Sequence, residues 1–343
     1  MAGRNRESVH YQAVRRYLVR KFIIYLITFF VAATIDWLLP RLVPGNPVSL
    51  LLAKMNLQPQ TYNATYNLYM KAFGFNRPWW QQYLNFWRAL LHGNLGVSIY
   101  DFPKPVTSVI ADYVLFTLAL LIPAIILAYL AGNKVGAIAA RRKSLDNTVL
   151  PVGYLLTATA YPWLALLLAF LLAAGGIGHF FPISGGFSYG LIPSFRWPFI
   201  WSLVTHWFLP FLTLFLVAFG GWAIGMRNLI IYELESDYTH YLEALGAPTR
   251  LVRKYAYRNA MLPQLTGLAL QLGVIVGGAV VTEVTFAYPG LGYLIFQAVG
   301  NDDYFLLQGI FMFIIVGVLI ANFIVDIIYV LVDPRTRVGI SGA

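Results

Sequence analysis

The chain has 343 residues, of which 59% are hydrophobic and only 11% are charged, and its mean hydropathy is +0.67. This composition excludes an ordinary soluble globular protein and indicates an integral membrane protein. The formal net charge of +10 at pH 7 does not call for a nucleic-acid partner, because basic residues of membrane proteins usually mark the cytoplasmic side.

Six apolar segments approach the length of about 20 residues that a helix needs to cross a hydrocarbon core of roughly 30 Å. The pattern predicts an all-α integral membrane protein with six transmembrane helices, at 21–40, 113–133, 149–174, 206–226, 262–286 and 306–332. The first apolar run follows Arg20 and Lys21 and is too long for a signal peptide, so we expect a retained span. Membrane lipid is therefore the surrounding solvent.

The basic residues predict the orientation of these spans. The two terminal stretches and the connections after the predicted second and fourth spans hold 17 of the 24 Lys and Arg residues. The short connections on the other side hold only Arg196, and the long loop after the first span is a poor reporter of orientation. We therefore expect both termini in the cytoplasm.

The long outer loop contains a stripe of apolar and aromatic residues at helical spacing, which predicts a short helix. The stripe consists of Trp79, Trp80, Tyr83, Phe86, Trp87 and Leu90. Such a helix either lies at the membrane interface or caps the bundle, or it offers a surface on which a ligand stacks. The sequence leaves both open.

Prolines and glycines occur within the predicted spans. Pro123 and Pro162 are expected to kink the second and third spans, because proline removes a backbone hydrogen bond. The fifth span carries four small-residue positions, at Gly267, Gly273, Gly277 and Gly278. These glycines either allow close helix packing or line a pathway.

Three carboxylates fall within the predicted spans, where each costs roughly 2.5 to 3.5 kcal/mol at the bilayer centre. Asp36 and Glu283 lie near the outer helix ends, where we expect them to reach water. Asp326 lies near the inner end of the last span and is expected to have a structural partner. This pattern gives weak support to an ion-coupled secondary transporter, which needs such groups near the midplane.

No motif assigns an enzymatic reaction to the chain. It contains no G-x-x-x-x-G-K-[ST] phosphate loop, no H-E-x-x-H zinc motif and no G-x-S-x-G nucleophile elbow. It also contains no cysteine, so it forms no disulfide bond and no thiolate metal site. We expect no catalytic residue, no metal site and no cofactor of its own.

A polar stretch before the fifth span predicts a bent cytoplasmic element. Residues 238–245 can form two helical turns, Gly246 suits the left-handed residue that closes a helix, and Pro248 suits the first turn of a second short helix. On that second helix Arg250, Lys254 and Arg258 share one face, and Pro263 marks entry into the fifth span. The element can carry force from a docked partner, or it is an ordinary amphipathic connector.

Five phrases in this order resemble one family over nearly the whole chain. They are RLVPGNP (41–47), FNRPWWQQYLNFWRALLHGNLGVSI (75–99), LEALGAPTRLVRKYAYRNAMLP (242–263), EVTFAYPGLGYLIFQAVGNDDYFLLQG (283–309) and NFIVDIIYVLVDPRTR (322–337). With them the chain resembles the B-type permease subunit of binding-protein-dependent ABC importers, in the peptide/nickel branch that includes the oligopeptide and dipeptide permeases.

The resemblance implies a type I importer permease fold in the plasma membrane. It implies an N-terminal segment with the first span and outer loop at 1–112, a core permease domain at 113–337 and a tail at 338–343. The implied partners are a homologous C-type permease, two ATP-binding subunits that carry ATP and magnesium, and an extracellular solute-binding protein. The chain then forms half of a translocation path. The solute is an oligopeptide or an oligosaccharide, and the sequence does not distinguish between the two.

The resemblance also implies two sets of site residues. In the family a cytoplasmic E-A-A-x-x-x-G phrase forms the coupling helix that docks on the ATPase; here Gly246 matches the glycine, whereas His240, Tyr241 and Leu242 replace E-A-A. The expected coupling residues are Tyr238, His240, Tyr241, Leu242, Glu243, Ala244, Gly246 and Ala247. The expected pathway residues are Gly273, Gly277, Glu283, Tyr288, Pro289 and Gly290.

Overall fold

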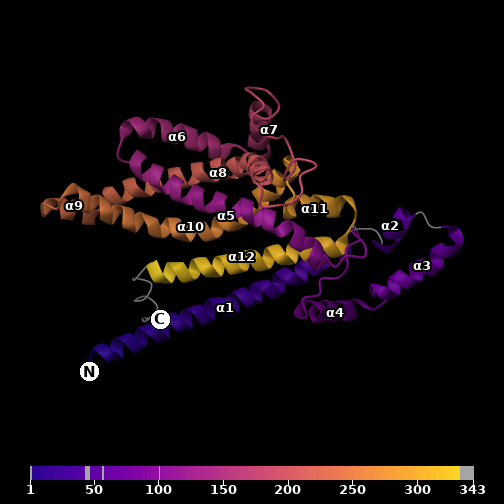
Figure 1. Cartoon of the computed structure of the whole chain (residues 1–343). Helices are drawn as coiled ribbons and strands as arrows, with labels where there is room; N and C mark the ends of the chain where they lie inside the picture. Colours follow the sequence, from indigo (N-terminus) through magenta and orange to yellow (C-terminus); the bar gives the residue numbers. More distant parts are fainter. Residues whose placement is uncertain (1, 43–46, 56–57, 100, 333–343) are drawn as a thin grey trace. The chain divides into compact units, whose positions relative to one another are not determined.

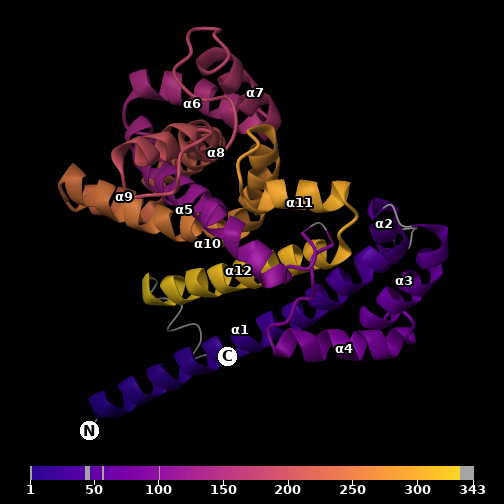
Figure 2. The same ribbon diagram turned by 45° about the vertical axis from the view of Figure 1, so that its right-hand side comes forward.

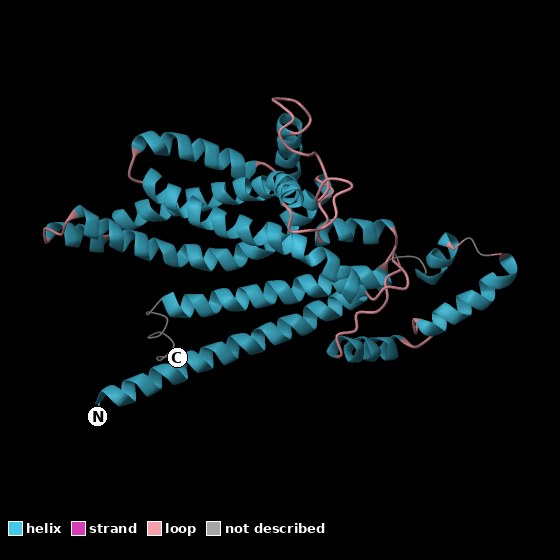
Figure 3. Ribbon diagram, viewed as in Figure 1, coloured by secondary structure: helices cyan, strands magenta, loops and turns pink. Residues whose placement is uncertain are grey.

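The computed structural model describes residues 2–42, 47–55, 58–99 and 101–332 (Figure 1). Within these ranges the chain folds into helices and loops and contains no β-strand (Figure 3). The helices are α1 (Ala2–Leu42), α2 (Pro47–Lys54), α3 (Pro59–Ala72), α4 (Trp79–Leu91), α5 (Val106–Ala139), α6 (Lys143–Ala158), α7 (Tyr161–Leu172), α8 (Trp197–Leu234), α9 (Asp237–Ala244), α10 (Thr249–Thr285), α11 (Leu291–Gly300) and α12 (Tyr304–Val332).

By their contacts the helices form two compact units. Unit 1 comprises Met1–Ile23, Phe116–Pro289 and Ile320–Ala343, and unit 2 comprises Ile24–Leu115 and Gly290–Leu319. Helices α1, α5 and α12 therefore contribute residues to both units. The domain division predicted at residue 113 stays a prediction.

Four helices in the described part of the chain are long and apolar enough to cross a membrane. They contain Arg16–Leu42, Val106–Ala139, Trp197–Leu234 and Tyr304–Ile328. These correspond to the predicted first, second, fourth and sixth spans, which are thus confirmed as long apolar helices. Helices α6 and α7 pass the same test only as a bent pair, which raises the number to five.

The predicted third span is broken, which the expected proline kink did not anticipate. Helices α6 and α7 meet at an angle of 107°. Thr159 and Ala160 between them are extended, and Pro162 lies in the first turn of α7. Proline is tolerated there because the first turn has no N–H bond to lose, so Pro162 starts a new helix. The expectation of one kinked helix is wrong.

The core of unit 1 forms around α8, which packs against α6, α7 and α10. Trp222 of α8 is buried, and its ring meets the ring of Tyr129 from α5 edge-on, with 4.9 Å between the centroids. A Cβ atom at Gly136 of α5 would collide with the carbonyl oxygen of Ala223. The glycine therefore lets the backbones of α5 and α8 approach closely.

In unit 2 the start of α12 is fixed to the loop before α5. The buried carboxylate of Asp303 accepts hydrogen bonds from the Ser98 hydroxyl (2.6 Å), the Ile99 N–H (2.6 Å) and the Leu306 N–H (2.9 Å). The last of these bonds caps the first turn of α12. One side chain thus joins segments about two hundred residues apart in sequence.

The predicted aromatic helix in the outer loop is α4, and its stripe packs against α1 within unit 2. Tyr83 lies edge-on to Trp37 with centroids 5.0 Å apart, and Trp87 stacks on Phe30 at 5.1 Å. The Tyr83 hydroxyl is also 2.8 Å from the hydroxyl of Thr34. These contacts favour the role of α4 as a helix that caps α1.

Candidate functional site

The bent element predicted before the fifth span consists of α9, a tight turn and the start of α10 (Figure 2). Gly246 closes α9 with a φ of +76°, and its N–H donates to the carbonyl of Glu243 at 2.9 Å. Pro248 is the extended residue directly before Thr249, where α10 begins. The left-handed glycine is thus confirmed, and Pro248 caps the second helix from just outside its first turn.

Beyond this turn the structure differs from the sequence expectation. Helix α10 runs without interruption from Thr249 to Thr285, so the separate short helix ending before Pro263 is wrong. A single proline removes one hydrogen bond and kinks a helix, but in a spanning helix the neighbouring structure tolerates this loss. At about 1.5 Å per residue, one continuous helix of roughly 55 Å links the turn at Gly246 to Glu283.

The inner face of α9 is anchored to the end of α8. Thr239 is fully buried, and its hydroxyl lies 2.9 Å from the carbonyl of Leu234 and 2.6 Å from that of Ser236. The Tyr238 hydroxyl donates to the Glu233 carboxylate at 2.6 Å. Burial and the interaction with Glu233 raise the pKa of the Tyr238 phenol. Tyr238 thus fixes α9 to the end of α8, and its expected role in coupling stays a prediction.

The outer face of α9 presents an exposed apolar pair. Tyr241 and Leu245 are both 66% exposed and lie four residues apart on one helical face. His240 and Glu243 are exposed beside them, with 3.9 Å between Nδ1 and Oε2. Sequence reasoning missed Leu245, although its spacing from Tyr241 would have placed it on the same face.

The remaining coupling candidates complete this turn. Ala244 and Gly246 are exposed, whereas Leu242 and Ala247 are half-buried. The Ala247 N–H donates to the Leu242 carbonyl at 3.0 Å, which closes the helix end. Five of the eight predicted residues therefore lie at the surface: His240, Tyr241, Glu243, Ala244 and Gly246.

Basic residues surround this turn. The predicted face of Arg250, Lys254 and Arg258 is exposed along the first turns of α10. Arg141 follows the end of α5, and burial together with the neighbouring charge of Arg253 lowers the pKa of its guanidinium. This positive surface can meet lipid phosphates or an acidic protein surface.

The predicted pathway glycines lie on α10. Gly277 is exposed, and a Cβ atom added there would find no neighbour within 4 Å. At Gly278 the same atom would come 2.6 Å from the Tyr161 ring, so close packing explains Gly278 but not Gly277. Gly273 also belongs to α10, but its surroundings lie outside the described part of the chain.

Glu283 is fully buried in unit 1, where the Thr117 hydroxyl of α5 donates to its carboxylate at 2.7 Å. Asp36, in unit 2, is only 3% exposed. The expectation that both carboxylates reach water is therefore wrong, because neighbouring helices cover them. Asp326 forms a 3.1 Å ion pair with Lys21, as expected of a carboxylate with a structural partner.

The loop that follows Glu283 is packed tightly. Tyr288 is 3% exposed and lies edge-on to Phe116 at 5.7 Å. The half-buried Pro289 abuts Gly186, where a Cβ atom would come 2.6 Å from its ring. Gly290, in unit 2, is buried and precedes the first turn of α11. Within unit 1 the predicted coupling residues precede the start of α10, whereas the predicted pathway residues of this unit lie in the second half of α10 and just after its end.

Comparison with known proteins decides the family. The family described as "Binding-protein-dependent transport system inner membrane component" matches residues 132–338, more than half of the chain. The chain belongs to this family. The family and the several apolar helices place this inner membrane component in the plasma membrane as a multi-pass protein.

Three relatives illustrate its place in the family. The di/tripeptide transport system permease protein DppB of Pseudomonas aeruginosa is 31% identical over 337 residues, which cover 94% of this chain and 98% of the relative. The dipeptide permease DppB of Alkalihalophilus pseudofirmus is 31% identical over 336 residues, 94% and 99% of the two chains. The oligopeptide permease AppB of Bacillus subtilis is 26% identical over 323 residues, 93% and 98%. The B-type resemblance is thus confirmed.

Proposed function

We propose that this inner membrane component is the B-type permease subunit of an ATP-driven importer of peptides. In this proposal it forms half of the translocation path, and a homologous C-type permease forms the other half. The similarity to relatives named for di/tripeptide, dipeptide and oligopeptide transport, over 93% or more of the chain, supports a peptide as the solute. The expectation of an oligosaccharide has no such support.

The proposal includes a six-span topology with both termini in the cytoplasm. The bent pair α6 and α7 serves as the third span and the outer part of α10 as the fifth. The distribution of basic residues supports this orientation. Unit 2 then contains the outer loop, with α2, α3 and α4 on the external side, where a solute-binding protein delivers the peptide.

The observation that carries the mechanism is the geometry of α9. Its inner face is fixed to α8 through Thr239 and Tyr238, and its outer face exposes Tyr241 and Leu245. An apolar pair held rigidly at the surface is suited to dock in a cleft of a partner. We propose that an ATP-binding subunit covers this face, and that its movement on ATP binding is transmitted along α10 to Gly277 and Glu283.

Energy enters from the partners in this proposal. The chain carries no phosphate-loop motif, so two ATP-binding subunits hold ATP and magnesium. Their closure would displace α9 and switch the shared cavity between inward-open and outward-open states, a rigid-body transition of packed helices. The chain itself is a permease without a catalytic site.

The rival function is an ion-coupled secondary transporter, which the matching family and the relatives do not favour. Reconstitution of the complete complex in proteoliposomes separates the two functions. We expect uptake of a radiolabelled dipeptide that requires ATP and the solute-binding protein and that is insensitive to a dissipated proton gradient. Uptake without ATP that is driven by an imposed proton or sodium gradient would overturn the proposal.

A further inference from the structure

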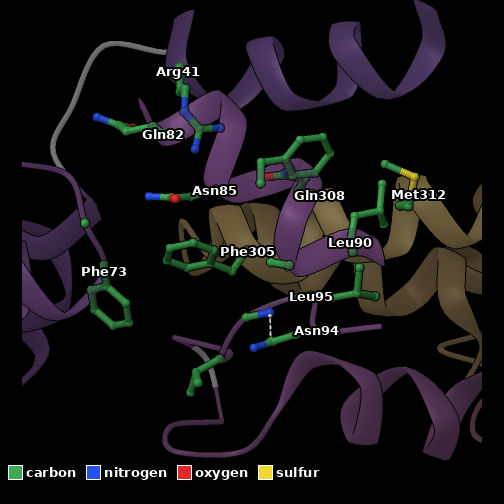
Figure 4. Close-up of a pocket in the computed structure, with 16 residues that line it drawn as sticks. Arg41, Phe73, Gln82, Asn85, Leu90, Asn94, Leu95, Phe305, Gln308 and Met312 are labelled. Atoms are coloured by element: carbon green, nitrogen blue, oxygen red, sulfur yellow. Dashed lines mark hydrogen bonds between the residues drawn. The ribbon is translucent and has the colours of Figure 1, made fainter. Parts of the chain in front are cut away.

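Unit 2 contains a cavity that none of the predicted site residues lines. Its volume is about 360 Å³, at the lower end of the roughly 300 to 1,000 Å³ of small-molecule sites. Its walls come from the end of α1, the turn after α3, helix α4, the loop at residues 94–97 and the first turns of α12 (Figure 4). All of these segments belong to the same unit.

One cation lines this cavity, and its position is fixed. The Arg41 guanidinium lies 4.2 Å over the Trp37 ring, and its Nη1 donates to the Trp37 carbonyl at 2.6 Å. Its Nε is buried and has no hydrogen-bond partner among the described residues. No acidic residue of the described chain lines the cavity. Asp36 is buried nearby on α1 and interacts electrostatically with Arg41, but within the described part of the chain neither of its oxygens accepts a hydrogen bond.

Amide side chains stand beside this cation. Gln82 donates from Nε2 to the Arg77 carbonyl at 2.8 Å, which orients its Oε1 as an acceptor. Asn85 and Gln308 also line the cavity, and no atom of the described chain forms a hydrogen bond with their side chains. The oriented Oε1 of Gln82 and the amide groups of Asn85 and Gln308 are suited to bind the N–H and C=O groups of a ligand.

The opposite end of the cavity is apolar. Figure 4 shows Arg41, Gln82 and Asn85 at one end and Leu90, Leu95 and Met312 at the other. In this view the Phe305 ring lies below Asn85. The cavity therefore offers a cationic end, amides and an apolar end within one small volume.

The apolar and loop walls are held in place without a ligand. Asp303 ties the loop before α5 to the start of α12, as described above. Asn94 accepts a hydrogen bond from the Gly96 N–H at 2.9 Å, which fixes the lining turn. Gly96 adopts a φ of +91°, and a Cβ atom there would crowd the Phe305 ring at 3.1 Å. A preformed wall lowers the entropic cost of binding.

We propose that this cavity is a binding site for a short peptide with a free terminal carboxylate. The carboxylate pairs with Arg41, a peptide bond pairs with the free amides, and an apolar side chain lies against Leu90, Leu95 and Met312. The choice of a peptide rests on the proposed function, whereas the choice of an anionic group with an apolar neighbour rests on the cavity itself. In the proposed topology the site belongs to the part of the chain that includes the outer loop on the external side.

The test is direct binding to the purified full chain in phosphatidylcholine nanodiscs, by calorimetry with leucyl-leucine. We expect the amide-blocked analogue leucyl-leucinamide to bind about tenfold more weakly, because it lacks the carboxylate. Gln308→Glu places a negative charge in the cavity with almost no change in shape and should weaken leucyl-leucine binding by a similar factor. Arg41→Gln should do the same, and its melting temperature reports whether the fold persists.

Arg88→Gln is the matched control, because Arg88 is an exposed residue of α4 that does not line the cavity. Equal binding of the two ligands, or equal affinity in Gln308→Glu and Arg88→Gln, would overturn the proposal. So would displacement of leucyl-leucine by phosphatidylglycerol, which would assign the cavity to a lipid phosphate. If these results arise while the complex still imports leucyl-leucine with ATP, the cavity assignment fails and the proposed function stands.

Discussion

At the scale of single residues, the hydrogen bond between Thr117 and Glu283 gives a stability prediction. Thr117→Val keeps the shape but removes the hydroxyl that donates to the buried carboxylate. We expect a loss of about 1 to 3 kcal/mol in unfolding free energy, because the buried carboxylate then loses this hydrogen bond. Denaturant titration of the purified chain checks this.

Thr266→Val is the control for this substitution, because Thr266 is exposed on the same α10 helix and bonds only to its own helix. It should leave the unfolding free energy nearly unchanged. Equal losses of unfolding free energy in the two variants would show that the hydrogen bond to Glu283 does not contribute more to stability than a bond within the helix.

Gly277 gives a prediction about transport. Gly277→Leu fills the open space beside α10 and should reduce dipeptide uptake in proteoliposomes if the helix lines the path. Gly317→Leu is the matched control: Gly317 is an exposed glycine of α12, and a Cβ atom there also meets nothing within 4 Å. Wild-type uptake by Gly277→Leu, or an equal loss in both variants, would remove Gly277 from the pathway.

Local residue chemistry could be predicted from sequence, and long-range surroundings could not. The left-handed Gly246 follows from its place between a helical pattern and a proline. The burial of Glu283 depends on Thr117, which is 166 positions away in the chain. A position near the end of a spanning helix suggests that the side chain reaches water. The structure shows instead that a neighbouring helix covers the Glu283 carboxylate.

At the scale of elements, the turn between α9 and α10 gives the prediction on coupling. Gly246→Pro removes the N–H bond to Glu243 and cannot adopt a φ of +76°. We expect the substitution to abolish peptide-stimulated ATP hydrolysis by the reconstituted complex, while the chain still assembles in the membrane.

Gly190→Pro is the matched control for this turn. Gly190 has a φ of +85°, a Cβ atom there meets nothing within 4 Å, and it lies in the loop before α8. It imposes the same backbone conflict far from α9, and stimulated hydrolysis should persist. Full stimulation in Gly246→Pro would exclude a coupling role for the turn.

Prolines explain where element prediction from sequence succeeded and failed. Apolar length alone predicted α1, α5, α8 and α12 as spans. The third span is broken at the extended residues Thr159 and Ala160, and Pro162 lies in the first turn of the next helix, whereas Pro263 lies within α10. The same residue type therefore lies at the start of one helix and in the interior of another.

At the scale of the whole molecule, the proposed topology is tested by labelling. The chain has no cysteine, so single cysteines can be introduced at Tyr189 and Leu245, which are both well exposed. A membrane-impermeant maleimide should label position 189 from outside intact cells and position 245 only after the membrane is opened. The reverse pattern would contradict cytoplasmic termini.

The central claim is that an ATP-binding subunit docks on the outer face of α9. The most direct measurement introduces a photo-crosslinking phenylalanine at Tyr241, with Tyr189 as an exposed tyrosine control in the loop before α8. In the complex purified from its native host, irradiation should join position 241, but not position 189, to the ATP-binding subunit. An active complex in which position 241 never joins that subunit would contradict the account.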